Sequence, residues 1–299
     1  MAACLMTGWA AQNTNAIRQP YCLATNLAFP TLSPDGRQIA CFVPRPTPRI
    51  EIWDLEGTTN RVLVEEAQRP AWSPDGRWIA FQQTRMVPGL TSQYGFTRIN
   101  ETMVMAPQGG RPRFVYPGAS PHWSADGQRL FVLDEDNGQI VACFVDKPED
   151  EPPVWWKLNK TPVARIAPDG RKVVVLTNDS LAVLSREKQE LEFLIPIGNV
   201  RSLDFTWSPD SQALLVTVGN TGNQEDTAAA WWVDLQAQKL HCLSKGVWQS
   251  SAVSPKTGTV VLTRVRSPST WLWVFPPEWV EARKAGRVPP FEPPPPPVD

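Results

Sequence analysis

Short apolar segments alternate with polar turns along the whole chain, and one phrase marks the turns at regular intervals. The phrase reads Ala-Trp-Ser-Pro-Asp-Gly at residues 71–76, and six versions of it recur about 40 to 50 residues apart. Ser, Pro and Gly in this order suit a type I turn, with the glycine free to adopt a positive φ beside the next strand. The phrase therefore predicts a hairpin turn in each of six repeated units. The six copies occupy residues 31–36, 71–76, 122–127, 165–170, 206–211 and 252–257.

The strand after each turn is apolar at three consecutive positions. In the first unit these positions are Ile39, Ala40 and Cys41, and the other five units keep apolar residues at the same offsets. A sheet with one solvated face would alternate apolar and polar residues, so this pattern indicates a strand that is buried on both faces. Further strands follow in most units. We therefore predict an all-β fold in which six four-stranded antiparallel blades cover one another in a ring, a six-bladed β-propeller.

The sixth unit has no fourth strand of its own. Pro276 and Pro277 end its third strand, because proline cannot donate to a ladder. Residues 16–25 are the spare candidate, and Pro20 is acceptable there because an outermost strand is an edge. We predict that this N-terminal segment completes the sixth blade and closes a propeller that spans residues 16–275.

These repeats resemble those of the TolB-type β-propeller family. The resemblance rests on the Ser-Pro-Asp-Gly turns, the apolar strand after each turn, and the Trp-Asp-Leu sequence at residues 53–55, and it covers residues 26–275. It implies a TolB-like propeller, but the same repeats build periplasmic scaffolds, sugar-processing lyases and the propeller halves of prolyl-peptidase-like enzymes. The α/β domain that precedes the propeller in TolB has no counterpart here, so TolB's own partners are not carried over.

Composition narrows the classes of function. The 299 residues include 29 Lys and Arg against 30 Asp and Glu, a net charge of -1, so we expect no nucleic-acid partner. The 31 prolines and 14 tryptophans are typical of a turn-rich, aromatic-rich β protein. Only two histidines are present and Gly-x-Ser-x-Gly is absent, which disfavours His-based metal sites and Ser-His-Asp chemistry. We expect no catalytic residue, no metal and no cofactor.

The two ends of the chain differ from the propeller. Residues 1–15 are apolar and uncharged, like the end of a secretory signal whose positive start lies upstream, and Cys4 would then be a lipid acceptor. This predicts a periplasmic protein of the cell envelope; if the segment is instead an ordinary disordered N-terminus, the protein is cytoplasmic. No run of 18 apolar residues exists, so no transmembrane segment is expected. We expect a monomer.

Residues 276–299 form the C-terminal segment. Prolines at its start, acidic residues early, basic residues late and Gly286 at the end predict a short helix. After Arg287 the sequence is rich in proline and predicts polyproline II without a core, either a stiff solvated end or a docking segment for an aromatic groove.

Arginines gather at positions that a propeller places around its channel mouth. The loops that enter the inner strands, and those that join the second and third strands, surround this mouth. Guanidinium groups there bind carboxylates through paired N–H donors, and the alternative is that they are solvated loop charges. The second unit also has about ten extra residues between Phe81 and Thr102, a long loop that either contacts a partner or folds back on its rim.

The sequence thus predicts a non-catalytic platform for a protein or peptide partner at the channel mouth. The rival hypothesis is an enzyme or binder that uses the channel for an acidic sugar or another small anion. His122, which precedes a tryptophan, is expected to be packed or hydrogen-bonded rather than a base. The predicted partner-binding residues are Arg45, Arg85, Arg266, Arg69, Arg165, Arg201, Tyr94 and Phe96.

Overall fold

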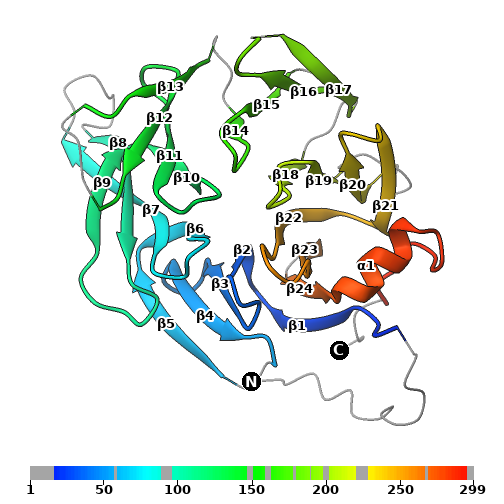
Figure 1. Ribbon diagram of the computed structural model, residues 1–299. Coiled ribbons are helices and arrows are strands. Elements are labelled where there is room, and N and C mark those ends of the chain that lie inside the picture. Colours follow the sequence, from blue (N-terminus) through cyan, green and yellow to red (C-terminus); the bar gives the residue numbers. More distant parts are fainter. Residues whose placement is uncertain are drawn as a thin grey trace.

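A computed structural model shows six four-stranded antiparallel sheets arranged in a ring, which confirms the six-bladed β-propeller (Figure 1). The sequentially joined strands of a blade run from the centre outwards, and the sixth blade takes its outer strand from the N-terminus. The structure describes residues 17–56, 59–88, 96–146, 151–158, 163–177, 180–188, 190–197, 202–219, 228–266 and 269–294.

Each blade contributes one strand to each of four concentric positions. The inner strands are β2 (Ala28–Leu32), β6 (Ala67–Trp72), β10 (Ala119–Trp123), β14 (Ala164–Ile166), β18 (Ser202–Trp207) and β22 (Trp248–Val253). The second strands are β3 (Gln38–Val43), β7 (Ile79–Pro88), β11 (Arg129–Asp134), β15 (Lys172–Leu176), β19 (Ala213–Gly219) and β23 (Val260–Arg266). The third strands are β4 (Arg49–Asp54), β8 (Phe96–Met105), β12 (Gln139–Phe144), β16 (Ser180–Ser185), β20 (Ala229–Asp234) and β24 (Ser269–Phe275). The outer strands are β5 (Asn60–Glu65), β9 (Arg113–Pro117), β13 (Val154–Lys157), β17 (Leu191–Pro196), β21 (Lys239–Lys245) and β1 (Tyr21–Thr25).

The repeated phrase forms the predicted hairpin turn, and its polar residues explain why. In the second blade the Ser73 hydroxyl donates to the Asp75 carboxylate at 2.6 Å, and the same carboxylate accepts the Arg77 backbone N–H at 3.0 Å. Gly76 has a φ of 79°, which favours glycine. The turn thus satisfies its own polar groups while the strands on either side are buried.

The second strands are buried on both faces, as their sequence predicts. Ile39, Ala40 and Cys41 of β3 are fully buried between neighbouring blades. Tryptophans that precede the turns join adjacent blades: the Trp123 indole N–H donates to the Ala71 carbonyl at 3.0 Å, and Trp207 donates to the Arg165 carbonyl at 3.0 Å. Core packing is therefore repeated from blade to blade around the ring.

The N-terminal strand closes the ring as predicted. β1 pairs antiparallel with β24, with Tyr21 opposite Val274, and lies at the outer edge of the sixth blade. Arg18 also forms an ion pair with Glu278 of helix α1 (Pro277–Lys284), so the two ends of the chain are tied together.

The prediction that the tail has no core is wrong for its first half. Phe291 packs on an aromatic cluster, with its ring centroid 5.0 Å from that of Trp273 and 5.4 Å from that of Phe275. Its backbone forms a parallel bridge with Ser244 at the edge of β21. This contact covers both an exposed strand edge and an apolar face. The proline content of the segment does not by itself predict such a contact.

The lengthened second blade is also more regular than expected. β7 and β8 extend to ten residues each and remain paired up to Pro88 and Phe96, so part of the predicted loop is a hairpin arm. Residues 89–95 lie outside the described residues. No helix among the described residues is long and apolar enough to cross a membrane. Residues 1–15, with Cys4, lie outside the described part of the chain.

Candidate functional site

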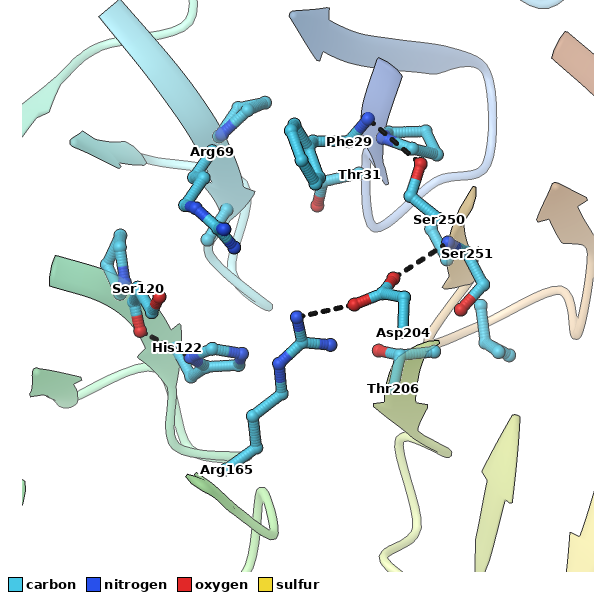
Figure 2. A pocket seen from close by; sticks show the side chains of 16 residues that line it. Phe29, Thr31, Arg69, Ser120, His122, Arg165, Asp204, Thr206, Ser250 and Ser251 are labelled. Atoms are coloured by element: carbon cyan, nitrogen blue, oxygen red, sulfur yellow. Dashed lines mark hydrogen bonds and ion pairs between the residues drawn. The ribbon is translucent and has the colours of Figure 1, made fainter. Parts of the chain in front are cut away.

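The inner strands of the six blades enclose a cavity of about 150 Å³ on the axis of the propeller (Figure 2). Its walls are polar rather than apolar, with arginine, histidine, aspartate, serine and threonine side chains directed toward the centre. The side chains that matter for its chemistry are Arg69, Ser120, His122, Arg165, Asp204 and Ser251.

Three of the inner strands carry the same backbone irregularity beside this cavity. Phe29, Arg69 and Ser120 each precede a proline, and their φ values are 47°, 52° and 51°. Each lies in a β-bulge of its inner strand, where one extra residue interrupts the pairing with the second strand. Bulges re-aim side chains, and a positive φ at a residue other than glycine is strained, a feature that clusters at functional sites.

Arg165 and Asp204 form an ion pair between the fourth and fifth blades. The Arg165 Nη2 lies 2.6 Å from Asp204 Oδ1, and the other carboxylate oxygen accepts the Ser251 backbone N–H at 3.2 Å. The Arg165 guanidinium also lies over the Phe205 ring. Both charges of this pair are thereby neutralised within the cavity wall.

Arg69 has no such partner. Its guanidinium carbon lies 4.8 Å from the centroid of the Phe29 ring, and it forms no ion pair with any residue that the structure describes. Burial and the positive charge of Arg165 lower the pKa of Arg69, although Asp204 and Glu135 oppose this effect. A half-buried guanidinium in this setting favours an incoming anion.

His122 is neutral and held in one orientation. Its Nδ1 lies 2.6 Å from the Ser120 carbonyl oxygen, so Nδ1 must carry the proton that it donates. Burial and the nearby guanidinium of Arg165 lower the pKa of His122 to about 3. The expectation of a hydrogen-bonded histidine is confirmed, and the imidazole adds no charge at neutral pH.

The charges of the cavity therefore do not cancel. Arg69 and Arg165 are cationic, Asp204 is anionic, and His122 is neutral, which leaves one positive charge. A single excess charge, with donors on Arg69, suits a monovalent anion such as a carboxylate.

A wider cavity of about 400 Å³, here called the funnel, lies where the inner strands of the second, third and fourth blades begin. It shares Arg69, Ser120 and Arg165 with the narrower cavity, so the two are neighbours. The funnel is also lined by Gln82, Arg98 and Glu135, whose carboxylate accepts a hydrogen bond from Asn100 at 2.9 Å.

The structure brings together only part of the predicted arginine set. Arg69 and Arg165 line both cavities. Arg45 lies exposed between β3 and β4, and Arg85 is paired with Glu101 along the hairpin arm, so neither lines these cavities. Arg201, Tyr94 and the side chains of Arg266 and Phe96 lie outside the described residues. Their role in binding a partner stays a prediction.

Ser120, Ser251, Gln82 and Glu135 belong to the site but were not singled out by the sequence. The repeated proline at positions 30, 70 and 121, always at the same distance before the turn phrase, is the signal that marks the bulges. No comparable pattern marks Gln82 or Glu135, which approach the funnel only through the ring arrangement of the blades.

The acidic sequence at residues 134–138 forms a plain hairpin turn. The Asp134 carboxylate accepts hydrogen bonds from the Asn137 backbone and side chain and from Gln139 at 2.8–3.1 Å. Within the described ranges, no group of three or more His, Cys, Asp or Glu residues is placed to hold a metal ion.

No protein-family model matches the sequence, and no curated protein matches it. Solved structures do match: TolB from Acinetobacter baumannii aligns with a TM-score of 0.56 and 16% identity over 76% of this chain. The propeller is TolB-like. The match covers 56% of that TolB chain, so the present chain spans little more than half of its length.

Other propellers resemble the chain to a similar degree. An oligogalacturonate lyase in complex with manganese aligns with a TM-score of 0.52 and 13% identity, over 86% of this chain and 78% of the lyase. The Cps50 (Swd1) β-propeller domain from Myceliophteria thermophila has a TM-score of 0.51 and 13% identity, over 85% and 99% of the two chains. Likeness at this identity shows the TolB-like propeller fold, which hosts both enzymes and non-enzymes.

Proposed function

We propose that this propeller is a non-catalytic binding platform that captures a carboxylate group of a protein or peptide partner at the mouth of its central channel. The observation that carries the proposal is the Arg69 guanidinium, which is half-buried at the channel cavity and forms no ion pair with a described residue, although Asp204 and Glu135 attract it from a longer distance. A partner carboxylate would supply the paired acceptor that the folded chain lacks.

A contribution to the stability of the fold does not explain why an arginine occupies position 69. Arg69 lies near a second guanidinium, its backbone is in the left-handed region, and it contacts the Phe29 ring without an ion pair to any described residue. Burial, like-charge repulsion and a strained φ each cost free energy in the folded state. Because the charge of Arg69 costs free energy in the folded state, its presence is better explained by a role in binding than by a structural role.

A macromolecular partner suits the shape of the entrance. The funnel is wider than the channel cavity and has Arg98 and Glu135 on its wall, so it offers several polar contacts ahead of Arg69. Binding residues of propellers sit on loops that a rigid scaffold positions, and the hairpin arm of β7 and β8 extends from the second blade, which contributes to the funnel.

Cross-linking in the cells that produce the protein tests the proposal. We expect a reproducible partner whose links map near residues 69, 85 and 98, and we expect Arg69→Gln to abolish its capture. Arg77→Gln is the matched control, because Arg77 lies at the turn after β6, at the opposite end of that strand, and is paired only with exposed carboxylates. Capture that survives Arg69→Gln would refute the proposal.

The proposed location is the bacterial cell envelope. The apolar, uncharged residues 1–15 support it, because they resemble the end of an export signal. Cell fractionation of the native protein tests this, and recovery in the cytoplasm would contradict it.

A second candidate function is the binding or conversion of an acidic sugar in the channel. The size of the narrow cavity, about 150 Å³, favours it, since this volume holds one small ring. A thermal-shift screen of acidic sugars separates the two: stabilisation by galacturonate that disappears in Arg69→Gln would support the second function.

A further inference from the structure

We propose that the group bound in the channel is the free C-terminus of the partner polypeptide, with its α-carboxylate on Arg69 and its last residues in the funnel. This inference rests on the proposed function, in which the channel captures a carboxylate, and it specifies which carboxylate. Three properties of the described residues support it: the net charge of the cavity, two buried polar groups without partners, and the sizes of the two neighbouring cavities.

The charge of the cavity matches one carboxylate. In the smaller cavity Asp204 pairs with Arg165 at 2.6 Å, and Arg69 forms no ion pair with a described residue, although Asp204 and Glu135 attract it from a longer distance. An α-carboxylate carries a single negative charge and presents two oxygens to a guanidinium in the geometry that arginine prefers. A phosphate group would bring up to two negative charges and leave one unbalanced in a partly buried site.

Two buried polar groups along the same path lack hydrogen-bond partners among the described residues. Gln82 lines the funnel and Ser251 lines the cavity, and these residues are 4% and 7% exposed. The Gln82 amide oxygen and the Ser251 hydroxyl are themselves buried, so a ligand would reach them after a rotation of the side chain. Leaving such groups unsatisfied costs about 1–3 kcal/mol each. The end of a polypeptide carries backbone N–H groups next to its carboxylate, so it supplies a donor for Gln82 while its carboxylate lies at Arg69.

The sizes of the two neighbouring cavities suit a chain end. The funnel of about 400 Å³ and the cavity of about 150 Å³ lie side by side, and Arg69 lines both. A cavity of the smaller size holds a group about as large as benzene. One terminal residue fits this space, and the residues before it would then lie in the funnel.

The test uses a random heptapeptide library displayed with free C-termini, which is selected on the full-length protein. Each selected peptide is then synthesised twice, as the free acid and as the C-terminal amide, and its Kd is measured by fluorescence polarisation. We expect the free acid to bind at least tenfold more tightly than the amide. Arg69→Gln should weaken the free acid at least tenfold and leave the amide unchanged, and Arg77→Gln should change neither.

Gln82→Met gives a second, independent readout. Methionine has a similar volume and removes the unpartnered amide, so a purely structural role predicts an equal or higher Tm and unchanged binding. Binding through Gln82 predicts a severalfold loss of affinity for the free acid together with that equal or higher Tm.

Three outcomes would overturn the inference: equal affinity of acid and amide, selection of no peptide at all, or selection of an internal acidic motif that ignores amidation. The proposed function fails separately, when Arg69→Gln leaves partner capture in cells unchanged. Displacement of a selected peptide by galacturonate, with no effect of amidation, would assign the site to an acidic sugar instead.

Discussion

Arg165 of β14 and Asp204 of β18 join two blades across the channel wall, with side chains only 13% and 11% exposed. The same aspartate holds the Ser251 backbone N–H of β22, so one carboxylate connects three neighbouring blades. Because a partly buried ion pair has lost much of its hydration, each partner depends on the other. Arg69, whose guanidinium carbon lies 4.8 Å from the centroid of the Phe29 ring and which forms no ion pair with a described residue, contrasts with this pair within the same cavity.

Removal of Asp204 should destabilise the fold. Asp204→Ala leaves the Arg165 guanidinium in the cavity without its carboxylate, and we expect the free energy of unfolding to fall by about 3 kcal/mol. Urea denaturation measures this change. Arg77→Ala, which breaks only exposed pairs, should leave the urea midpoint close to that of the unchanged protein. A loss below about 1 kcal/mol for Asp204→Ala would show that the pair does not join the blades.

Arg69→Gln should leave stability nearly unchanged. The variant loses the contact with the Phe29 ring, worth about 0.5–1 kcal/mol, and also loses the repulsion from Arg165. We expect a free energy of unfolding within about 1 kcal/mol of the parent, while Arg165→Gln lowers it clearly because Asp204 is then unpaired. If Arg69→Gln unfolds as readily as Arg165→Gln, Arg69 is a structural residue and the binding proposal loses its main support.

Stability should fall as the pH is lowered from 6.5 toward 3. The pKa of His122 is about 3 in the fold and about 6.5 in an unfolded chain, so unfolding takes up a proton throughout this window. The free energy of unfolding should then drop by up to about 1.4 kcal/mol per pH unit. His122→Gln should remove this dependence between pH 6 and 4.5.

Carboxylates contribute to the same trend only at lower pH. Hydrogen bonds from Ser33 and from the Arg37 backbone lower the pKa of Asp35 despite partial burial, and Asp126 behaves in the same way. Their stabilisation is present above the unfolded pKa of about 3.9 and is lost below it.

A stability curve for His122→Gln that matches the parent between pH 6 and 4.5 would contradict the assignment of that window to His122.

Phe291→Ala should lower the stability of the protein, because it removes a contact between the C-terminal tail and the sixth blade. Phe291 packs against Trp273, Phe275 and Trp279, and we expect a loss of about 2–3 kcal/mol because the ring is only half-buried. Thermal unfolding followed by tryptophan fluorescence measures it. Glu292→Gln, which breaks an exposed pair with Lys245, is the control and should leave the midpoint of thermal unfolding nearly unchanged. Equal midpoints for the two variants would mean that the tail does not stabilise the sixth blade.

The fold followed from the sequence because each blade is a local unit that repeats. The Ser73 and Asp75 side chains make the turn within a few residues, and consecutive apolar positions such as Ile39 to Cys41 mark a strand that is buried on both faces. The sixth unit has no outer strand of its own, and the N-terminal segment was the one spare candidate to supply it. β1 lies in that segment and forms the outer strand. The packing of Phe291 escaped prediction because it joins the tail to Ser244 at the edge of β21, 47 residues away in the sequence.

The sequence by itself determined the six-bladed ring, its closure by the N-terminal strand, and the positions of Arg69 and Arg165 at the start of inner strands. Only the tertiary structure decided which of these charges are balanced, because the Arg165–Asp204 pair and the contacts of Arg69 join residues far apart in the chain. Turns and strands arise from interactions between neighbours in sequence, whereas the net charge of the channel depends on six strands converging on one axis. That convergence places the Arg69 guanidinium at the channel cavity without an ion pair to any residue in the described ranges.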